Sequence, residues 1–196
     1  MSKLAANKAA KTRAIIDAAR MQFLTGGYAD ASMDAIAKAA GVTKQTVYRY
    51  FPSKDNLFEA TLKDMGNRTH DHLIDLAANP DTAAALEEFA VGFVKGHLTQ
   101  KHLDTIRLLI AEAPRAPHLL QLFNAIGRVP TTHQLATFFA DRFHVEDPEV
   151  MANLWTSMLL TLRHDVLVGS PYPSDDRIRK HAHNCTAFLL AALEQK

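Results

Sequence analysis

The sequence predicts an all-α fold, with a small N-terminal helical domain followed by a larger helical one. Apolar residues recur mostly at intervals of three and four positions, as on one face of a helix, and do not alternate as in a half-buried strand. Cap residues, glycines and prolines separate these stretches from one another. The 196 residues, of which 47% are hydrophobic, are enough for a small domain joined to a larger one.

The first helix is expected over residues 9–24. Ile15, Ala19 and Phe23 lie at offsets of four positions and form one apolar stripe. Gly26-Gly27 follows directly and is typical of the end of a helix. This segment therefore has one face that must be buried by the helices after it.

Two short helices are expected next. Ser32 suits the N-cap of a helix over residues 33–40, which ends at Gly41. Thr43 suits the N-cap of a helix over residues 44–51. The gap between the two helices is short enough to be a tight turn.

The remaining helices make up the rest of the chain. A fourth helix is expected after Ser53 and as far as residue 79, and Pro148 suits a first helical position further on. The other expected ranges are 82–98, 103–113, 117–128, 130–143, 148–168 and 175–194. We expect the N-terminal domain to cover residues 10–70 and the C-terminal domain residues 71–196.

The charge is distributed unevenly between the two parts. Residues 1–54 hold nine Lys or Arg and three Asp, a net charge of +6, whereas the remainder has a net charge of −5. This asymmetry favours a polyanionic partner for the N-terminal part, although a basic solvated helix face would have the same composition.

Residues 33–51 carry the most informative pattern. Two helices that cross steeply need a small residue on the first, a glycine in the turn and an apolar residue on the second, and Ala37, Gly41 and Val47 meet these needs in order. An ordinary helical hairpin is the alternative. It is less favoured because the second helix is rich in polar and basic side chains and has no acidic one, which suits DNA.

The stretch from Thr12 to Phe58 resembles the N-terminal domain of TetR/AcrR-type transcriptional regulators. The matching elements are the Ile15/Ala19/Phe23 helix, Gly27-Tyr28, Ile36-Ala37, Ala40-Gly41-Val42, Tyr48-x-Tyr50-Phe51 and Ser53-Lys54-x-x-Leu57. A second stretch, RLLIAEAPRAPHLLQLF from Arg107 to Phe123, is similar to the AefR-like C-terminal domain of one TetR subgroup.

The resemblance implies a helix-turn-helix that binds double-stranded DNA. Ser32, Thr43 and Lys54 would contact phosphates; Lys44, Gln45 and Thr46 would meet base edges; Tyr48, Arg49 and Tyr50 would hold the backbone. Many relatives have a glycine near position 45, where this chain has Gln45 and Thr46, which leaves the register of the base contacts open.

The resemblance also implies a homodimer that binds a palindromic operator and answers to a small-molecule inducer or corepressor, most often as a repressor. An activator, or a regulator that answers to a protein partner, would fit the same residues. The apolar faces expected on the last two helices would form the dimer interface or be buried within one subunit; they contain Leu154, Trp155, Met158, Leu162, Ala182, Cys185, Leu189, Ala192 and Leu193. The expected effector pocket comprises Phe89, Phe93, His97, Ile106, Ile110, Phe123, Phe138, Trp155 and Met158. Ordinary core packing is the favoured explanation for most of them. His97, His102, His133 and His164 are the expected polar partners of an effector, although a core or surface role is favoured for these histidines as well. Arg107 and Glu112, five positions apart, do not face each other along one helix.

Other classes of function find little support. Ten histidines are present, but His70 and His72, like His181 and His183, are two positions apart and lie on different faces of a helix, so neither pair is expected to share a metal ion. No metal site is expected, and a histidine-ligated metal sensor is an alternative form of the regulator. We expect no catalytic residues, because no nucleophile elbow, P-loop or dinucleotide motif occurs. No signal peptide or membrane span is expected, and we expect a cytoplasmic protein without a cofactor. The alternative is a helical small-molecule-binding or enzymatic domain whose helix-turn-helix is vestigial.

Overall fold

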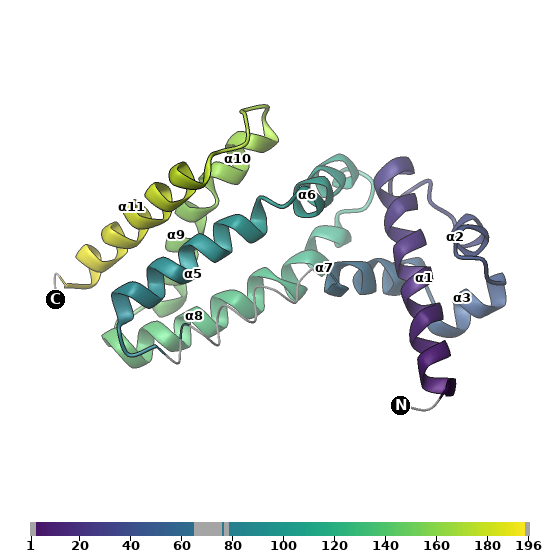
Figure 1. Ribbon diagram of the computed structural model, residues 1–196, viewed down its shortest axis with the longest axis horizontal. Coiled ribbons are helices and arrows are strands. Elements are labelled where there is room, and N and C mark those ends of the chain that lie inside the picture. Colours follow the sequence, from purple (N-terminus) through teal and green to yellow (C-terminus); the bar gives the residue numbers. More distant parts are fainter. Residues whose placement is uncertain (1–2, 65–75, 77–78, 195–196) are drawn as a thin grey trace. The chain divides into compact units, whose positions relative to one another are not determined.

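The computed structural model describes residues 3–64, 76 and 79–194, and no strand occurs among them, which confirms the all-α prediction (Figure 1). The labelled helices are α1 (Lys3–Gly26), α2 (Met33–Ala39), α3 (Lys44–Tyr50), α5 (Thr82–His97), α6 (Gln100–Glu112), α7 (His118–Ile126), α8 (Arg128–Phe143), α9 (Pro148–Leu159), α10 (Thr161–Leu167) and α11 (Asp175–Glu194). Residues 54–64 are also helical, and the expected continuation of that helix to residue 79 lies mostly outside the described residues.

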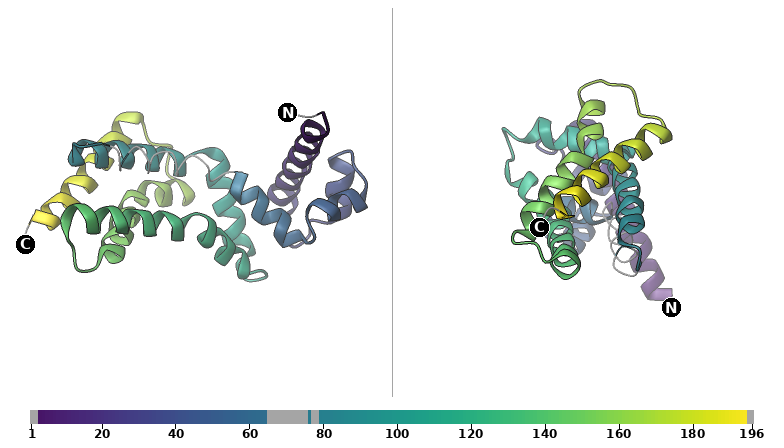
Figure 2. Two further views of the ribbon diagram at one scale, coloured as in Figure 1. Left: turned by 90° about the horizontal axis from the view of Figure 1, so that it is seen from below. Right: turned by 90° about the vertical axis from the view of Figure 1, so that its left-hand side faces the viewer.

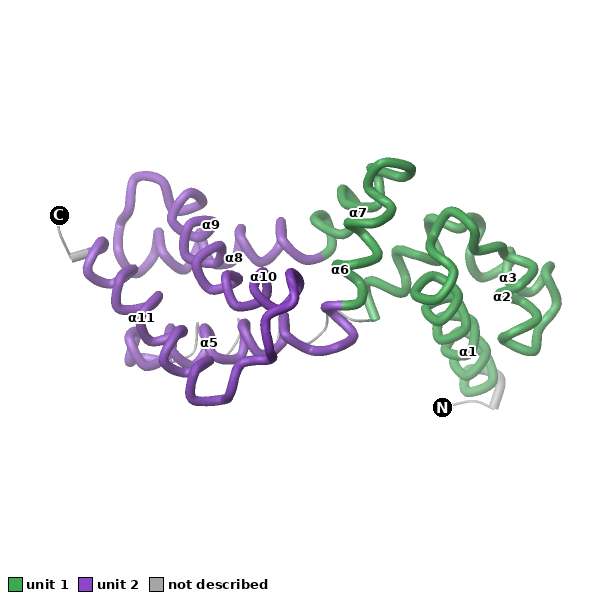
Figure 3. The backbone as a smooth tube through the Cα atoms, turned by 90° about the horizontal axis from the view of Figure 1, so that it is seen from above, with its two compact units in different colours: residues 1–65, 104–126 green, residues 66–103, 127–196 purple. Residues whose placement is uncertain are grey.

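The chain forms two compact units, drawn in two colours in Figure 3. Unit 1 contains residues 1–65 and 104–126, and unit 2 contains residues 66–103 and 127–196. Most of α6, from Asp104 onward, and all of α7 therefore belong to the same unit as α1, α2 and α3. The domain boundary expected after residue 70 lies outside the described residues.

The helix expected over residues 148–168 is two helices, α9 and α10, separated at Leu160. Hydroxyl groups on both sides of this position donate hydrogen bonds to carbonyl oxygens of the preceding turn. Ser157 Oγ lies 2.6 Å from the Asn153 oxygen, and Thr161 Oγ1 lies 2.8 Å from the Met158 oxygen. Such bonds compete with the backbone ladder and favour a break in the helix.

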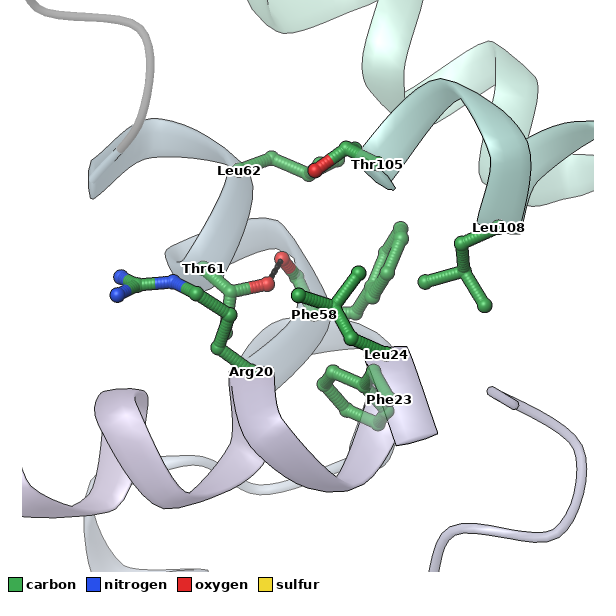
Figure 4. A pocket seen from close by; sticks show the side chains of 8 residues that line it. All are labelled: Arg20, Phe23, Leu24, Phe58, Thr61, Leu62, Thr105 and Leu108. Carbon is green, nitrogen blue, oxygen red and sulfur yellow. Dashed lines mark hydrogen bonds between the residues drawn. The ribbon is translucent and has the colours of Figure 1, made fainter. Parts of the chain in front are cut away.

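The core of unit 1 forms where the apolar stripe of α1 meets the neighbouring helices. Ile15, Ala19 and Phe23 are at most 1% exposed, as the sequence predicted. The rings of Phe23 and Phe58 meet edge to face, with centroids 5.3 Å apart. The cavity beside these rings is only about 10 Å³, and the side chains that surround it are drawn in Figure 4. That volume accommodates at most one water molecule, so this cavity is not an effector pocket.

The core of unit 2 is rich in aromatic rings. Helix α5 packs on α11, and α9 packs on both α8 and α11, as the views in Figure 2 show. Trp155 of α9 is fully buried and contacts Phe89 of α5 and Phe139 of α8, at centroid distances of 5.6 and 5.9 Å. No helix within the described residues is long and apolar enough to cross a bilayer.

Candidate functional site

Helices α2 and α3 form the helix-turn-helix that the sequence predicted. Ser32 and Thr43 cap the two helices, because their hydroxyl oxygens accept hydrogen bonds from the amides three positions ahead at 3.1 and 3.2 Å. Gly41 has a φ of +67° in the turn between them. Ala37 and Val47, the small and apolar residues expected at the crossing, are 3% and 0% exposed.

One face of α3 is exposed and carries most of the predicted DNA contacts. Lys44, Gln45, Tyr48 and Arg49 are exposed, whereas Thr46 and Tyr50 are partly buried. The Arg49 guanidinium carbon lies 5.6 Å from the centre of the Tyr50 ring, so the two side chains form a cation–π contact. The segment Lys44–Tyr50 has no acidic side chain.

Lys44 is held by a carboxylate on the preceding helix. Its Nζ donates to Asp34 Oδ2 at 2.9 Å, and this bond raises the pKa of Lys44. Both side chains are more than half exposed, so the pair contributes little to stability. A base or phosphate would therefore need to displace only a weak surface contact.

Lys54 contacts the backbone of the loop between α1 and α2. Its ammonium group donates to the carbonyl oxygens of Tyr28, Ala29 and Ala31, at 2.8, 3.0 and 3.0 Å. An ammonium group has three protons, and these three bonds use all of them. Without DNA, Lys54 therefore holds this loop, and the phosphate contact expected from the sequence would replace one of the three bonds.

Glu112, the last residue of α6, also contacts this loop. The buried Oε1 accepts hydrogen bonds from the amides of Tyr28 and Ala29, at 2.9 and 3.4 Å. Gly27 has a φ of +81°, and a Cβ at this position would lie 2.6 Å from Glu112 Oε1. The contact therefore depends on glycine both for its backbone angle and for its lack of a side chain.

A third contact joins the loop to α7. The Tyr28 hydroxyl donates to Asp55, and His118 Nε2 lies 3.1 Å from Asp55 Oδ1. Burial, reinforced by the bond to Asp55, raises the pKa of Tyr28, and the same bond lowers the pKa of Asp55. Together, Lys54, Glu112 and Asp55 fix the loop that leads into the helix-turn-helix, which we call the head loop (residues 27–31).

Comparisons with known proteins identify the family. Residues 15–61 match the family described as "Bacterial regulatory proteins, tetR family". Residues 84–194, more than half of the chain, match "AefR-like transcriptional repressor, C-terminal domain". The chain belongs to the TetR family.

Individual TetR-family relatives agree with this assignment. The regulator BetI of Cronobacter sakazakii is 28% identical over 154 residues, which are 78% of this chain and 75% of BetI. The regulator SrpR of Pseudomonas putida is 38% identical over 82 residues, which are 41% of this chain but only 36% of SrpR. The structure of the "Flavonoid-responsive Regulator FrrA" is 30% identical, with a TM-score of 0.78 over 93% of this chain and 96% of FrrA.

The chain is therefore a ligand-responsive, DNA-binding transcriptional regulator. TetR-family proteins are transcriptional regulators that bind DNA as dimers and respond to small molecules. The alternative of an enzymatic domain with a vestigial helix-turn-helix is not favoured.

The residues expected to line the effector pocket lie in different places. Phe89, Phe93, Phe138 and Trp155 belong to the core of unit 2, with Met158 packed against it, and the His97 ring is 4.1 Å from that of Phe93. Ile106 and Phe123 pack instead against the core of unit 1, and Ile110 is 63% exposed. The structure thus brings together those members of the set that lie on α5, α8 and α9.

The nine residues expected at the dimer interface differ in exposure, and Met158 is intermediate among them. Six are buried in the core of their own subunit, as the alternative reading of the sequence allowed: Trp155, Leu162, Ala182, Cys185, Leu189 and Leu193. Leu154 is 58% exposed, and Ala192 is exposed as well. Phe188, which the sequence analysis did not single out, is 67% exposed on α11.

Sequence reasoning missed the residues that hold the head loop. Glu112 is 84 positions from the amide it binds, and no local pattern reveals a contact at that distance. A carboxylate within the apolar stretch of α6 was the available hint that Glu112 has a buried partner. Arg107 is not that partner, because it pairs with Asp104 at 3.0 Å. Over the described residues, no group of three or more His, Cys, Asp or Glu side chains is placed to hold a metal ion.

Proposed function

We propose that this protein is a repressor that binds a palindromic operator as a homodimer, with α3 of each subunit in the major groove. The observation that carries this proposal is the exposed face of α3. Lys44, Gln45, Tyr48 and Arg49 point away from the core on a helix that has no acidic residue. A short helix of this kind presents its N-terminal side chains to base edges.

The contacts follow from the chemistry of each side chain. Gln45 is suited to a bidentate pair with adenine, Lys44 to the acceptors of guanine, and the Thr46 methyl group to thymine. Tyr48, Arg49 and Tyr50 reach the sugar-phosphate backbone. Ser32 and Thr43 place helix N-termini toward phosphates, and Lys54 supports Ser32 through the head loop.

A homodimer is proposed because one α3 offers too small a surface for operator specificity. Two subunits related by a twofold axis would bind half-sites about one helical turn apart or a multiple of that spacing. The exposed apolar side chains of the last helices, Leu154 on α9 and Phe188 on α11, support an interface there.

A small-molecule effector is proposed for unit 2. FrrA is flavonoid-responsive, as its name states, and the core of unit 2 in this chain contains Phe89, Phe93, Phe138, Phe139 and Trp155. An effector that prefers the state in which the two α3 helices do not match the operator would weaken DNA binding by its differential affinity.

The test is selection of DNA by the unliganded protein from a randomised duplex pool at two salt concentrations. We expect a palindromic site to be enriched. Gln45→Ala should reduce the preference for one base pair in each half-site by roughly 1 to 3 kcal/mol, while the matched control Gln134→Ala, on exposed α8 surface, should select the parental site. Binding without enrichment, or identical selection by Gln45→Ala, would overturn the proposed contacts.

A further inference from the structure

Unit 2 contains a partly buried cation for which the described residues supply no carboxylate partner. Arg163 of α10 is of intermediate exposure, but its Nε is buried and makes no hydrogen bond within the part of the chain that is described. Burial lowers the pKa of the guanidinium, with no neighbouring acid acting in the opposite direction. A charged group that is partly removed from water is normally compensated by an anion, because the lost hydration is unfavourable.

Two imidazoles accompany this cation and remain neutral. His97 Nδ1 is 2.7 Å from the carbonyl oxygen of Phe93, and the rings of His97 and His102 have centroids 4.6 Å apart. Burial first, and then the charge of Arg163, lowers the pKa of His97 to about 4. Burial, with His97 and Arg163, lowers the pKa of His102 to about 3. Neither ring therefore adds a positive charge at neutral pH, and neither neutralises Arg163.

A continuous row of rings ends at these imidazoles. It begins at Trp155 and passes through Phe89 and Phe93, with centroid distances of 5.6 and 5.5 Å. It continues from Phe93 to His97 and from His97 to His102, at 4.1 and 4.6 Å. Unit 2 thus places a buried cluster of aromatic rings in line with two neutral imidazoles, on which the charge of Arg163 acts.

We propose that Arg163, with His97 and His102, recognises the carboxylate of an aromatic effector whose ring packs among Phe89, Phe93 and Trp155. This inference rests on the proposed function, in which unit 2 receives a small molecule. The guanidinium presents paired N–H groups that match a carboxylate, and a ligand anion would supply the missing charge. A neutral ligand of the same shape would leave Arg163 unpaired.

The experiment uses the full chain and the fluorescence of Trp155, which is its single tryptophan. The probes are benzoate, phenylacetate and hydrocinnamate, each compared with its neutral amide. We expect at least one carboxylate to change the Trp155 emission saturably and its amide to bind about 30-fold more weakly or worse. Equal binding of acid and amide, or no response to any of the three acids, would overturn the proposal.

Variants separate the charge of Arg163 from general packing. Arg163→Met should lower affinity for the carboxylate about 30-fold or more and bring acid and amide to similar affinities, while Arg163→Lys should recover part of the difference. Arg177→Met is the matched control, because Arg177 is exposed in the same unit and has a partner in Asp165 at 3.5 Å. Melting curves and far-ultraviolet circular dichroism establish that each variant is folded. A folded Arg163→Met that binds the acid like the parent would contradict the assignment.

Failure of the carboxylate proposal can be distinguished from failure of the proposed repressor function. Operator selection by the unliganded protein tests DNA recognition and makes no use of the effector. Enrichment of a palindrome without carboxylate binding would remove the effector class and leave the repressor. Carboxylate binding without operator enrichment would keep the site in unit 2 and remove the repressor.

Discussion

At the scale of single residues, Gly27 is required for two reasons: its backbone angle and the close approach of Glu112. Both Gly27 and Gly41 have positive φ, but an added Cβ meets Glu112 only at Gly27 and has nothing within 4 Å at Gly41. A Cβ at Gly27 would displace the buried carboxylate and break its bonds to the amides of Tyr28 and Ala29.

We therefore expect Gly41→Ala to lower the free energy of unfolding by about 1 to 2 kcal/mol, through its backbone angle alone. Gly27→Ala should cost this amount plus about 1 to 3 kcal/mol for the displaced carboxylate. Urea denaturation of both variants measures the difference. Equal losses at the two glycines would mean that Glu112 moves aside without cost.

The buried imidazoles make stability dependent on pH. The pKa values of His97 and His102 are lowered to about 4 and about 3, whereas an unfolded histidine titrates near 6.5. Because the unfolded chain binds protons that the folded chain excludes, stability is complete above pH 6.5 and falls as the pH decreases toward 4. Each imidazole contributes up to about 1.4 kcal/mol per pH unit in this window.

Denaturation at pH 7 and pH 5 measures this loss, and His102→Asn should reduce it. His133→Asn is the matched control, because His133 is exposed on α8. If the slope between the two pH values were the same in His102→Asn and in the parent, His102 would titrate normally in the folded state.

The caps of α2 and α3, and the roles of Ala37, Gly41 and Val47, were predictable because they depend on residues a few positions apart. The contacts of Lys54 and Glu112 were not, since they join residues 23 to 84 positions apart along the chain. Local sequence patterns were therefore enough to predict the helix-turn-helix. The side chains that fix the head loop depend on tertiary packing and could not be predicted in this way.

At the scale of elements, the last turn of α6 supports the head loop through Glu112. Glu112→Ala should remove both hydrogen bonds from the loop amides and weaken binding to all DNA sequences similarly, because the proposed base contacts lie on α3 and not in this loop. We expect an affinity loss of about 5- to 30-fold, which corresponds to roughly 1 to 2 kcal/mol. Fluorescence anisotropy with operator and nonspecific duplexes measures it.

Glu112→Gln provides the conservative comparison. Its amide oxygen can still accept from Tyr28 and Ala29, and its NH₂ group replaces Oε2, a buried oxygen that makes no hydrogen bond with the described part of the chain. This variant should bind DNA within about threefold of the parent. A loss in Glu112→Ala confined to the operator would indicate a direct role in base recognition instead.

The helices of the C-terminal half show what periodicity leaves undetermined. Apolar spacing predicted one helix across residues 148–168, and the same spacing continues through the break at Leu160 between α9 and α10. Periodicity also could not assign Trp155 or Leu189 to a subunit core or to an interface, because both environments are apolar. Exposure in the folded chain separates them.

At the scale of the whole molecule, the positive charge of the N-terminal part is only partly available to DNA. Arg13 and Arg20 form ion pairs with Asp17 and Asp64, and Lys54 contacts carbonyl oxygens. Arg49 makes no ion pair within the described residues, and neither does Lys38 at the end of α2. The salt dependence of binding should therefore reflect a few phosphate contacts per subunit, fewer than the nine basic residues suggest.

The final prediction concerns dimerisation, because only a dimer can bind both half-sites of the operator at once with its two helix-turn-helix motifs. Phe188 and Leu154 are 67% and 58% exposed, and a carboxylate in an apolar interface is strongly unfavourable. Phe188→Glu should sediment as a monomer and bind the palindromic operator roughly 100-fold more weakly or worse, while its weak affinity for an isolated half-site is unchanged.

Val168→Glu, at a position 69% exposed beyond the end of α10, is the matched control and should remain dimeric. Sedimentation equilibrium at several concentrations distinguishes the two variants. A Phe188→Glu protein that stays dimeric and binds the full operator like the parent would place the interface elsewhere.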